Sequence, residues 1–488
     1  MKRIGVIAVA VLITVATHAE TPGVANPGFE QLLPDGTPAS WWLPPGPGTR
    51  SFTSAEGRHG KGGRLRVSGG SAAIGSVAQM IDPAPFRGKR VRLSVTFRAA
   101  TPVQAGPFLT VLRPDPYKIG FAGDGSDKPA PVGKWQEATI TGRVAQDATA
   151  IWIGLKAMGD ADVTVDDVRL EEARGSGKPP SPQAFAYLDQ AIAILRAHHI
   201  NSAKADWPRL IASAHDEIAG AKTVADTYAA IRDLIAELGE RHSFFMPPPT
   251  QAQIDAAAKA GSDGVVAGTQ MPSSALLGER IGVVRLPGLD TFSPGGGERA
   301  KAYPRLLRAA LEQLDKAPLC GWIVDLRTDS GGNMWPMLAG LDPLLGPAPF
   351  GFFVSPHGAT QPWTRTKDGV SAVAASAVPA ATPVFALAQA AAPVAVLIGP
   401  GTASSGEMTA IALIGRPGVR VFGGNSAGFL SGNVVLPLPD GAHIAVTEVL
   451  IRDRSGKDYT DAIHPDVVTD PGAAEAAAKA WLEQQCGK

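Results

Sequence analysis

The pattern of apolar residues changes twice along this chain of 488 residues, and these changes restrict the fold more than any other feature. Up to about residue 172, apolar and polar residues alternate, and clusters of Gly, Pro and Asp separate the runs. One run places Val91, Leu93 and Val95 on a single face. Alternation with a period of two between turn residues is typical of antiparallel sheets. We therefore predict a β-sandwich over residues 20–172.

The second pattern has the period of a helix. It follows residues 173–181, a stretch rich in Gly, Pro and Ser that is too polar to bury a core and therefore predicts a linker. In residues 182–245, apolar side chains recur at steps of three and four, and Asp206 precedes Trp207 and Pro208 as a helix N-cap would. These features predict a small bundle of three helices.

In the third pattern, over residues 246–488, predicted strands alternate with predicted helices. The expected strands are 281–286, 321–326 and 394–398, and the expected helices are 306–314 and 407–414. This order is typical of an α/β layer. The chain is thus predicted to be multidomain, with a sandwich, a helical bundle and an α/β core.

The N-terminus has the features of a secretory signal peptide. Lys2 and Arg3 precede an apolar run at residues 4–15, and small residues lead up to Ala19. The run is too short to span a membrane. We interpret residues 1–19 as a signal peptide that is removed, and we expect a periplasmic or secreted protein without an integral membrane segment.

Composition excludes several classes of partner and cofactor. The 45 basic and 45 acidic side chains balance, so nothing indicates a nucleic-acid or other polyanion binder. Neither His-Glu-x-x-His nor paired Cys-x-x-Cys spacing occurs, so we expect no metal and no cofactor. Cys320 and Cys486 are the two cysteines, and export would permit a disulfide, but the sequence leaves their pairing open.

Two strand ends contain residues suited to catalysis. The expected strand at 321–326 leads through Arg327 to Gly331 and Gly332. Glycines have no side chain to block the approach of a ligand to their backbone N–H groups. The alternative is an ordinary turn from strand to helix. The second leads through a Gly-Pro-Gly turn to Ser404 and Ser405, either of which could act as a nucleophile at a helix N-terminus. The alternative is that these serines only cap the helix, with Glu407 near its dipole.

A serine nucleophile needs a base, and His242 is the histidine best placed to provide one. It follows the last predicted helix of the bundle in the segment Leu-Gly-Glu-Arg-His-Ser, at a junction of domains where clefts commonly form. A lone histidine is more often structural than catalytic, so this position alone does not decide its role.

Three segments of the chain, taken in order, resemble those of the C-terminal processing (tail-specific) serine peptidases. They are Leu-Gly-x-x-His-Ser, Asp-Leu-Arg-x-x-x-Gly-Gly and Thr-Ala-Ser-Ser-Gly-Glu. The resemblance covers residues 182–469 and is to the branch of the tricorn core and the interphotoreceptor retinoid-binding protein repeats. It implies a crotonase/ClpP-like α/β core with Ser404 as the nucleophile. It further implies an oxyanion hole formed by the N–H groups of Ser405 and of the Gly331-Gly332 pair.

The sequence departs from the processing peptidases at the base. Phe429 stands where their catalytic lysine is found, so the Ser–Lys dyad is absent, and the resemblance to the tricorn branch implies His242 as the general base. The glutamate of that branch falls on Tyr459. We therefore expect Asp458 or Asp461 to supply the acid that orients the imidazole, with a further contribution from Ser243.

The N-terminal domain has its own resemblance. The segments at residues 26–30 and 165–170 resemble those of carbohydrate-binding jelly rolls, and Trp41 or Trp42 could stack on a sugar. Adjacent strand residues point to opposite faces, so at least one of the two is expected in the core. A carbohydrate partner is one interpretation, and a spacer or peptide-docking module is the one we favour.

These observations lead to one main prediction of function and two alternatives. The main prediction is an exported serine peptidase that cleaves peptide bonds of a peptide or protein substrate. The first alternative is a non-catalytic protein that binds apolar ligands or peptides on the same scaffold, as the retinoid-binding repeats do. The second is attachment to polysaccharide as the main role.

Overall fold

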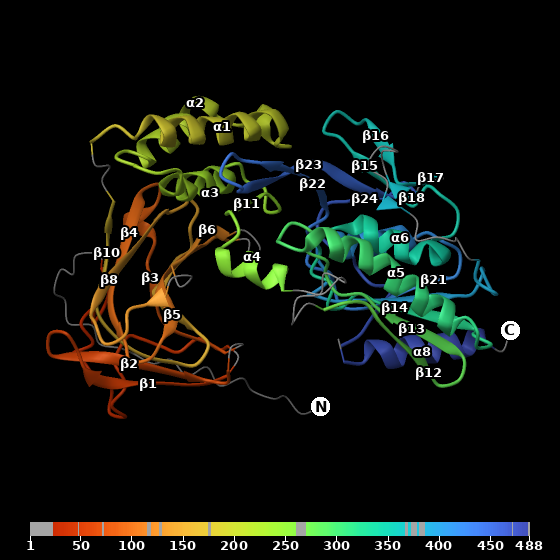
Figure 1. The fold of residues 1–488 in the computed structure, drawn as a ribbon, viewed down its shortest axis with the longest axis horizontal. Helices are drawn as coiled ribbons and strands as arrows, with labels where there is room; N and C mark the ends of the chain where they lie inside the picture. Colours follow the sequence, from red (N-terminus) through yellow and green to blue (C-terminus); the bar gives the residue numbers. More distant parts are fainter. Residues whose placement is uncertain are drawn as a thin grey trace, which may run out of the picture. The chain divides into compact units, whose positions relative to one another are not determined.

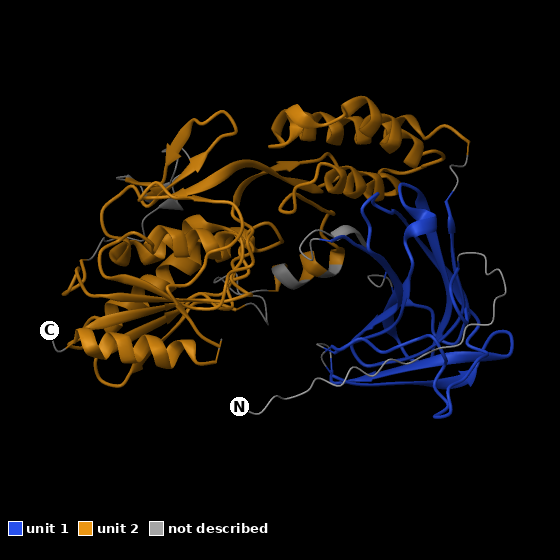
Figure 2. Ribbon diagram, turned by 180° about the vertical axis from the view of Figure 1, so that it is seen from behind, with its two compact units in different colours: residues 1–176 blue, residues 177–488 orange. Residues whose placement is uncertain are grey.

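The chain forms two compact units, residues 1–176 and 177–488, in the computed structural model (Figure 2). The structure describes residues 23–46, 48–70, 73–114, 119–125, 129–173, 177–259, 270–366, 369–371, 378–379, 386–470 and 472–486. The predicted signal peptide lies outside these residues, and so does part of the predicted linker.

The first unit is a sandwich of two antiparallel sheets. One sheet has the order β1 (Thr49–Glu56), β2 (Lys61–Ser68), β10 (Ala161–Glu172), β4 (Arg90–Ala99) and β8 (Gln136–Arg143). The other has the order β3 (Ile74–Ile81), β9 (Ala150–Met158), β5 (Val103–Leu112) and β6 (Ile119–Asp124), and β7 (Pro129–Ala130) pairs with β5.

The alternating residues face the interior of this sandwich. Val91, Leu93 and Val95 of β4 share one hydrophobic core with Ile151 and Ile153 of β9. Burial of one side of each strand explains the period of two in the sequence.

The two neighbouring tryptophans of this unit differ in burial. Trp41 is buried, and its indole N–H donates to the carbonyl of Asn26 at 3.0 Å. Trp42 is partly exposed and lies edge-on to Trp152. The expectation that at least one of the pair belongs to the core is therefore met by Trp41.

The second unit begins with three helices, α1 (Pro182–His198), α2 (Trp207–Glu217) and α3 (Tyr228–Glu237). The N-cap of α2 is Asp206, whose carboxylate accepts the Arg209 N–H at 3.2 Å. Apolar residues of the helices, such as Leu188 and Leu234, share a core with Ile444 of β23 (His443–Asp453). The helices therefore pack directly on a sheet of the same unit.

A six-stranded sheet forms the centre of the α/β part of this unit (Figure 1). Its order is β12 (Ser273–Leu277), β13 (Ile281–Arg285), β14 (Gly321–Asp325), β20 (Val394–Ile398), β21 (Val419–Gly423) and β25 (Val467–Val468), and only the β12–β13 pairing is antiparallel.

Helices cover both faces of this sheet. Alternate residues of β14 pack against α5 (Gly296–Leu314), α6 (Met334–Leu345) and α7 (Ser405–Leu413) on one face and against α8 (Ala474–Gln485) on the other. Burial on both faces explains why these strands are continuous apolar runs.

A second sheet of this unit has the order β11 (Phe244–Met246), β23, β15 (Gly351–Val354) and β16 (Thr360–Pro362). Strands β22 (Ser431–Pro437) and β24 (Asp458–Tyr459) also pair with β23. The remaining described elements are α4 (Gln251–Ala258) and the small sheet of β17 (Thr364–Thr366), β18 (Gly369–Ser371) and β19 (Val378–Pro379). Because β11 begins two residues after His242 and pairs with β23, the end of the helical segment is fixed to this sheet.

A disulfide joins Cys320, just before β14, to Cys486 at the end of α8, with the two Cα atoms 5.2 Å apart. The pairing that the sequence left open is therefore formed. In the described part of the chain, no helix is both long and apolar enough to span a membrane.

Candidate active site

Ser404 lies in a strained turn between β20 and α7. Its φ is +51°, a value that non-glycine residues rarely adopt. The turn is held by Thr402, whose hydroxyl donates to the Leu326 carbonyl at 2.8 Å, and by the Ala403 N–H, which donates to the Asp329 carbonyl at 2.9 Å. A serine in a tight turn from strand to helix is the arrangement of a nucleophile elbow.

His242 approaches Ser404 from the segment between α3 and β11. Its Nε2 lies 2.8 Å from the Ser404 Oγ, and the side chain is buried. The main chain of His242 is held on both sides: the carboxylate of Glu240 accepts its N–H, and the Asn433 amide donates to its carbonyl at 2.7 Å. The two residues that the sequence proposed as nucleophile and base are thus within hydrogen-bond reach.

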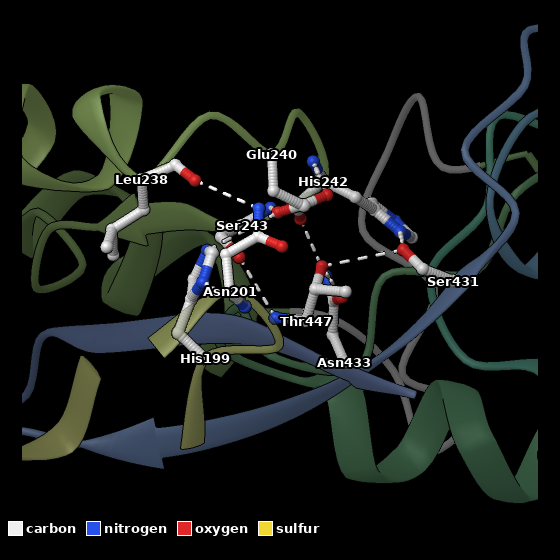
Figure 3. A network of polar contacts seen from close by, with 9 residues as sticks. All are labelled: His199, Asn201, Leu238, Glu240, His242, Ser243, Ser431, Asn433 and Thr447. Atoms are coloured by element: carbon white, nitrogen blue, oxygen red, sulfur yellow. Dashed lines mark hydrogen bonds and ion pairs between the residues drawn. The ribbon is translucent and has the colours of Figure 1, made fainter. Parts of the chain in front are cut away.

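A serine hydroxyl faces the other nitrogen of the imidazole (Figure 3). The Ser431 Oγ lies 2.8 Å from His242 Nδ1 and 3.4 Å from the Thr447 Oγ1, which donates to the side-chain Oδ1 of Asn433 at 2.8 Å. Sequence reasoning missed these residues. They lie on β22 and β23 in no recognisable motif, and only the antiparallel pairing of the two strands brings them together.

The aspartates expected at this position lie elsewhere. Asp458 forms an ion pair with Arg452, with a contact of 2.9 Å, and Asp461 faces His464 at 3.3 Å. Ser243, expected to help orient the ring, instead accepts the Thr447 backbone N–H at 2.9 Å. The expectation of a carboxylate is therefore corrected to a neutral hydroxyl, because β22 reaches the imidazole and the exposed aspartates do not.

Burial determines the protonation of His242. Burial lowers its pKa to about 4, the nearby charge of Glu240 and a hydrogen bond to the Ser431 backbone oppose this only in part, and the charge of Arg241 adds to the lowering. The imidazole is therefore neutral at neutral pH, which is the form that can accept a proton.

The glycine pair lies directly against Ser404. Gly331 and Gly332 have φ values of +104° and +112°. A Cβ on Gly331 would lie 2.7 Å from the Ser404 Cβ, and one on Gly332 would lie 2.0 Å from the Leu289 carbonyl oxygen. Only glycine fits at either position.

The amides of the two glycines differ in their contacts. The Gly331 N–H donates to the Asp329 carboxylate at 3.0 Å, so it is already engaged. Leu289 forms a parallel β-bridge with Gly332: its N–H donates to the Gly331 carbonyl, and its carbonyl accepts the Asn333 N–H. In this arrangement the Gly332 N–H is directed away from Leu289. Ser405 supports this turn, because its hydroxyl donates to the Gly332 carbonyl at 2.8 Å.

Glu407 has a larger role than the place near the helix dipole expected from the sequence. Its fully buried carboxylate accepts the Ser404 N–H at 2.8 Å and, on a neighbouring loop, the Ser426 hydroxyl and the N–H groups of Gly428 and Phe429. Burial raises the pKa of this carboxyl group. Glu407 thus ties the nucleophile to the loop that ends at Phe429.

Phe429 fills the position expected for a lysine in the processing peptidases. Its ring packs against the imidazole of His242 with centroids 5.4 Å apart, and the Arg241 guanidinium carbon lies over the ring, 5.1 Å from its centroid. An aromatic ring here excludes water from the base and adds no charge, which agrees with a site that uses histidine.

Comparisons with known proteins find a matching family and several similar proteins. The family model for peptidase family S41 matches residues 280–469, which include Ser404, the glycine pair and Ser431. The Nisin-resistance protein of Lactococcus lactis subsp. lactis is 27% identical over 308 residues, which are 63% of this chain and 89% of that protein.

Two solved structures are also similar. A lipoprotein from Streptococcus agalactiae matches with a TM-score of 0.50 and 23% identity, over 62% of this chain and 97% of that one. A photosystem II D1 C-terminal processing protease matches with a TM-score of 0.41 and 17% identity, over 59% and 94% of the two chains. The family match identifies residues 280–469 as a peptidase family S41 domain, and the protein as a serine-type peptidase.

Proposed function

We propose that this protein is an exported peptidase in which Ser404 attacks the peptide carbonyl and His242 acts as general base. The observation that carries the proposal is the 2.8 Å contact between His242 Nε2 and the Ser404 Oγ, made by a buried imidazole. The strained backbone of Ser404 adds support, because it holds the hydroxyl outside the regular helix.

Proton transfer requires one tautomer of His242. For Nε2 to accept the Ser404 proton, Nδ1 must carry the hydrogen and donate it to Ser431. The 2.8 Å contact of Nδ1 with the Ser431 Oγ supplies that acceptor. The imidazolium then returns the proton from Nε2 to the leaving amine, and water completes hydrolysis of the acyl-enzyme in the same way.

The negative charge of the tetrahedral intermediate would be held by backbone amides. The N–H of Ser405 opens α7, where the helix dipole favours an anion, and the Gly332 N–H is the member of the glycine pair not engaged by Asp329. We assign Ser405 and Gly332 as the donors and Gly331 as the residue that allows this turn to approach Ser404.

The positive charge on His242 would receive support from Glu240. This carboxylate accepts the backbone N–H groups of His242 and Ser243. It is therefore held near the imidazole without a hydrogen bond to the ring itself. It therefore attracts the imidazolium without forming a direct Asp–His pair.

Export and the sandwich complete the proposal. The Cys320–Cys486 disulfide is the kind of crosslink that persists outside the cytoplasm, and it supports a periplasmic or secreted location together with the predicted signal peptide. We propose that the sandwich docks substrate or carbohydrate. The name of the Lactococcus relative makes nisin one peptide to test as a substrate.

Fluorophosphonate labelling tests the assignment of the nucleophile. We expect labelling of the purified protein to be lost in Ser404→Ala and retained in the neighbouring Ser405→Ala, whose side chain faces Gly332. Peptide cleavage should follow the same order. Labelling that survives in Ser404→Ala, or that depends on Ser405 instead, would refute the assignment.

A further inference from the structure

Asp329 is a carboxyl group buried completely beneath the proposed oxyanion site, and the mechanism above does not use it. It lies in the turn that leads from β14 to the glycine pair, and none of its surface is exposed. One carboxyl oxygen accepts the Gly331 N–H at 3.0 Å. The other has no hydrogen-bond partner in the described part of the structure.

The same residue joins the two halves of the site. Its main-chain carbonyl accepts the Ala403 N–H at 2.9 Å, one residue before the nucleophile. Its side chain lies against the first turn of α7 so closely that a Cβ on Gly406 would be 2.8 Å from the Asp329 Cγ. Movement of Asp329 would therefore displace both the glycine turn and the Ser404 turn.

The surroundings of Asp329 disfavour an ionised carboxylate. Among the described residues, no cation contacts the carboxyl group, and the buried Tyr303 faces it from α5. The positive end of the α7 dipole and the Gly331 N–H favour the charged form, but complete burial opposes it more strongly. Glu407, the acidic residue of α7, is directed to the loop at Ser426 instead. Burial raises the pKa of Asp329 to about 8.

We propose that Asp329 is a positioning residue that acts as the neutral carboxylic acid, holding the glycine turn against Ser404 without placing a negative charge beneath the oxyanion. The inference rests on the proposed roles of Ser404, Ser405 and Gly332. A carboxylate hydrogen-bonded to Gly331 would repel the developing oxyanion across one residue of backbone, in a buried site where charges interact strongly. Ionisation of Asp329 should therefore slow acylation of Ser404 without displacing the serine or the histidine.

The first test is the pH dependence of fluorophosphonate labelling, from about pH 6 to about pH 10. The wild-type rate should fall at least about tenfold with a midpoint near pH 8, whereas Asp329→Asn, which keeps a neutral planar group, should lack this fall. At about pH 6 the Asn variant should retain a third or more of the wild-type rate, and Asp329→Ala should lose at least about tenfold. A flat wild-type profile, or the same alkaline fall in the Asn variant, would overturn the proposal.

A second measurement does not depend on activity. Infrared difference spectra between wild type and Asp329→Asn should contain the carbonyl band of one protonated carboxylic acid at about pH 6, and this band should disappear as pH rises through about 8. If Ser404 proves not to be the nucleophile but the band is present, the proposed function fails and the buried acid stands. If the band is absent at about pH 6, Asp329 is ionised and this inference is wrong even in an active peptidase.

Discussion

The contact between Ser431 and His242 should determine how much of the base is in the productive tautomer. Replacing Ser431 with Ala removes the hydroxyl at 2.8 Å from Nδ1 and leaves that buried N–H with only the main chain of residue 431 as a partner. An unsatisfied buried donor costs about 1–3 kcal/mol. Since about 1.4 kcal/mol corresponds to a factor of ten, we expect the labelling rate and kcat/KM to fall by about 5- to 150-fold.

Thr447→Val is the matched control for this change. It removes the next hydroxyl of the network, which lies 3.4 Å from Ser431 and does not touch the imidazole, and it keeps the shape of the side chain. We expect a loss below about threefold, because Ser431 still accepts from Nδ1. Both rates should be measured on variants whose thermal unfolding matches that of the wild type. An Ala variant within twofold of wild type, or an equal loss in both variants, would refute the role given to Ser431.

Two further predictions concern the glycine turn and the protonation of the base. Gly331→Ala should reduce activity by at least about 100-fold, because its Cβ would lie 2.7 Å from the Ser404 Cβ at a φ of +104°. The control is Gly297→Ala, which should retain activity because a Cβ there meets nothing within 4 Å. The acid limb of kcat/KM should have its midpoint near pH 4, where His242 becomes protonated, and not near the ordinary histidine value of about 6.5. The unfolded chain binds this proton first, so the free energy of unfolding should fall as pH decreases from about 6.5 to about 4, and His242→Gln should lack that contribution. An acid limb near 6.5, or an active Gly331→Ala variant, would contradict these expectations.

The sequence predicted the architecture where local patterns determine it. Alternating residues such as Val91 and Leu93 mark sandwich strands because one face of each is buried, and the continuous run of β14 marks a strand covered on both sides. Ser404 and the glycine pair were recognisable as candidates because each feature requires particular neighbouring residues. A nucleophile elbow needs a serine in a tight turn, and a backbone that approaches a ligand closely needs glycine.

The partners of these residues were not recognisable for a physical reason. Ser431 reaches His242 only because β22 pairs with β23 and β11 pairs with the same strand, so its role depends on register across segments distant in sequence. Glu407 was expected only to lie near the helix dipole, because the loop that completes its hydrogen bonds lies beyond the helix and leaves no signal in the local sequence. A search for carboxylates near Tyr459 in sequence could not find a hydroxyl on another strand.

Ser431 stands beside His242 where a carboxylate was expected, and this difference affects the rest of the proposed site. A base with a pKa of about 4 gains little free energy when it accepts the serine proton, so more of the transition-state stabilisation must come from the oxyanion side. In the proposed site, that side consists of backbone amides at Gly332 and Ser405, whose effect would be weakened by any negative charge placed behind them. Complete burial of Asp329, with no cation contact among the described residues, removes such a charge near neutral pH, since it keeps the proton on the carboxyl group. A neutral Ser431 beside the base and a neutral Asp329 beneath the oxyanion site are therefore parts of one electrostatic arrangement, and loss of either should make the enzyme more sensitive to loss of the other.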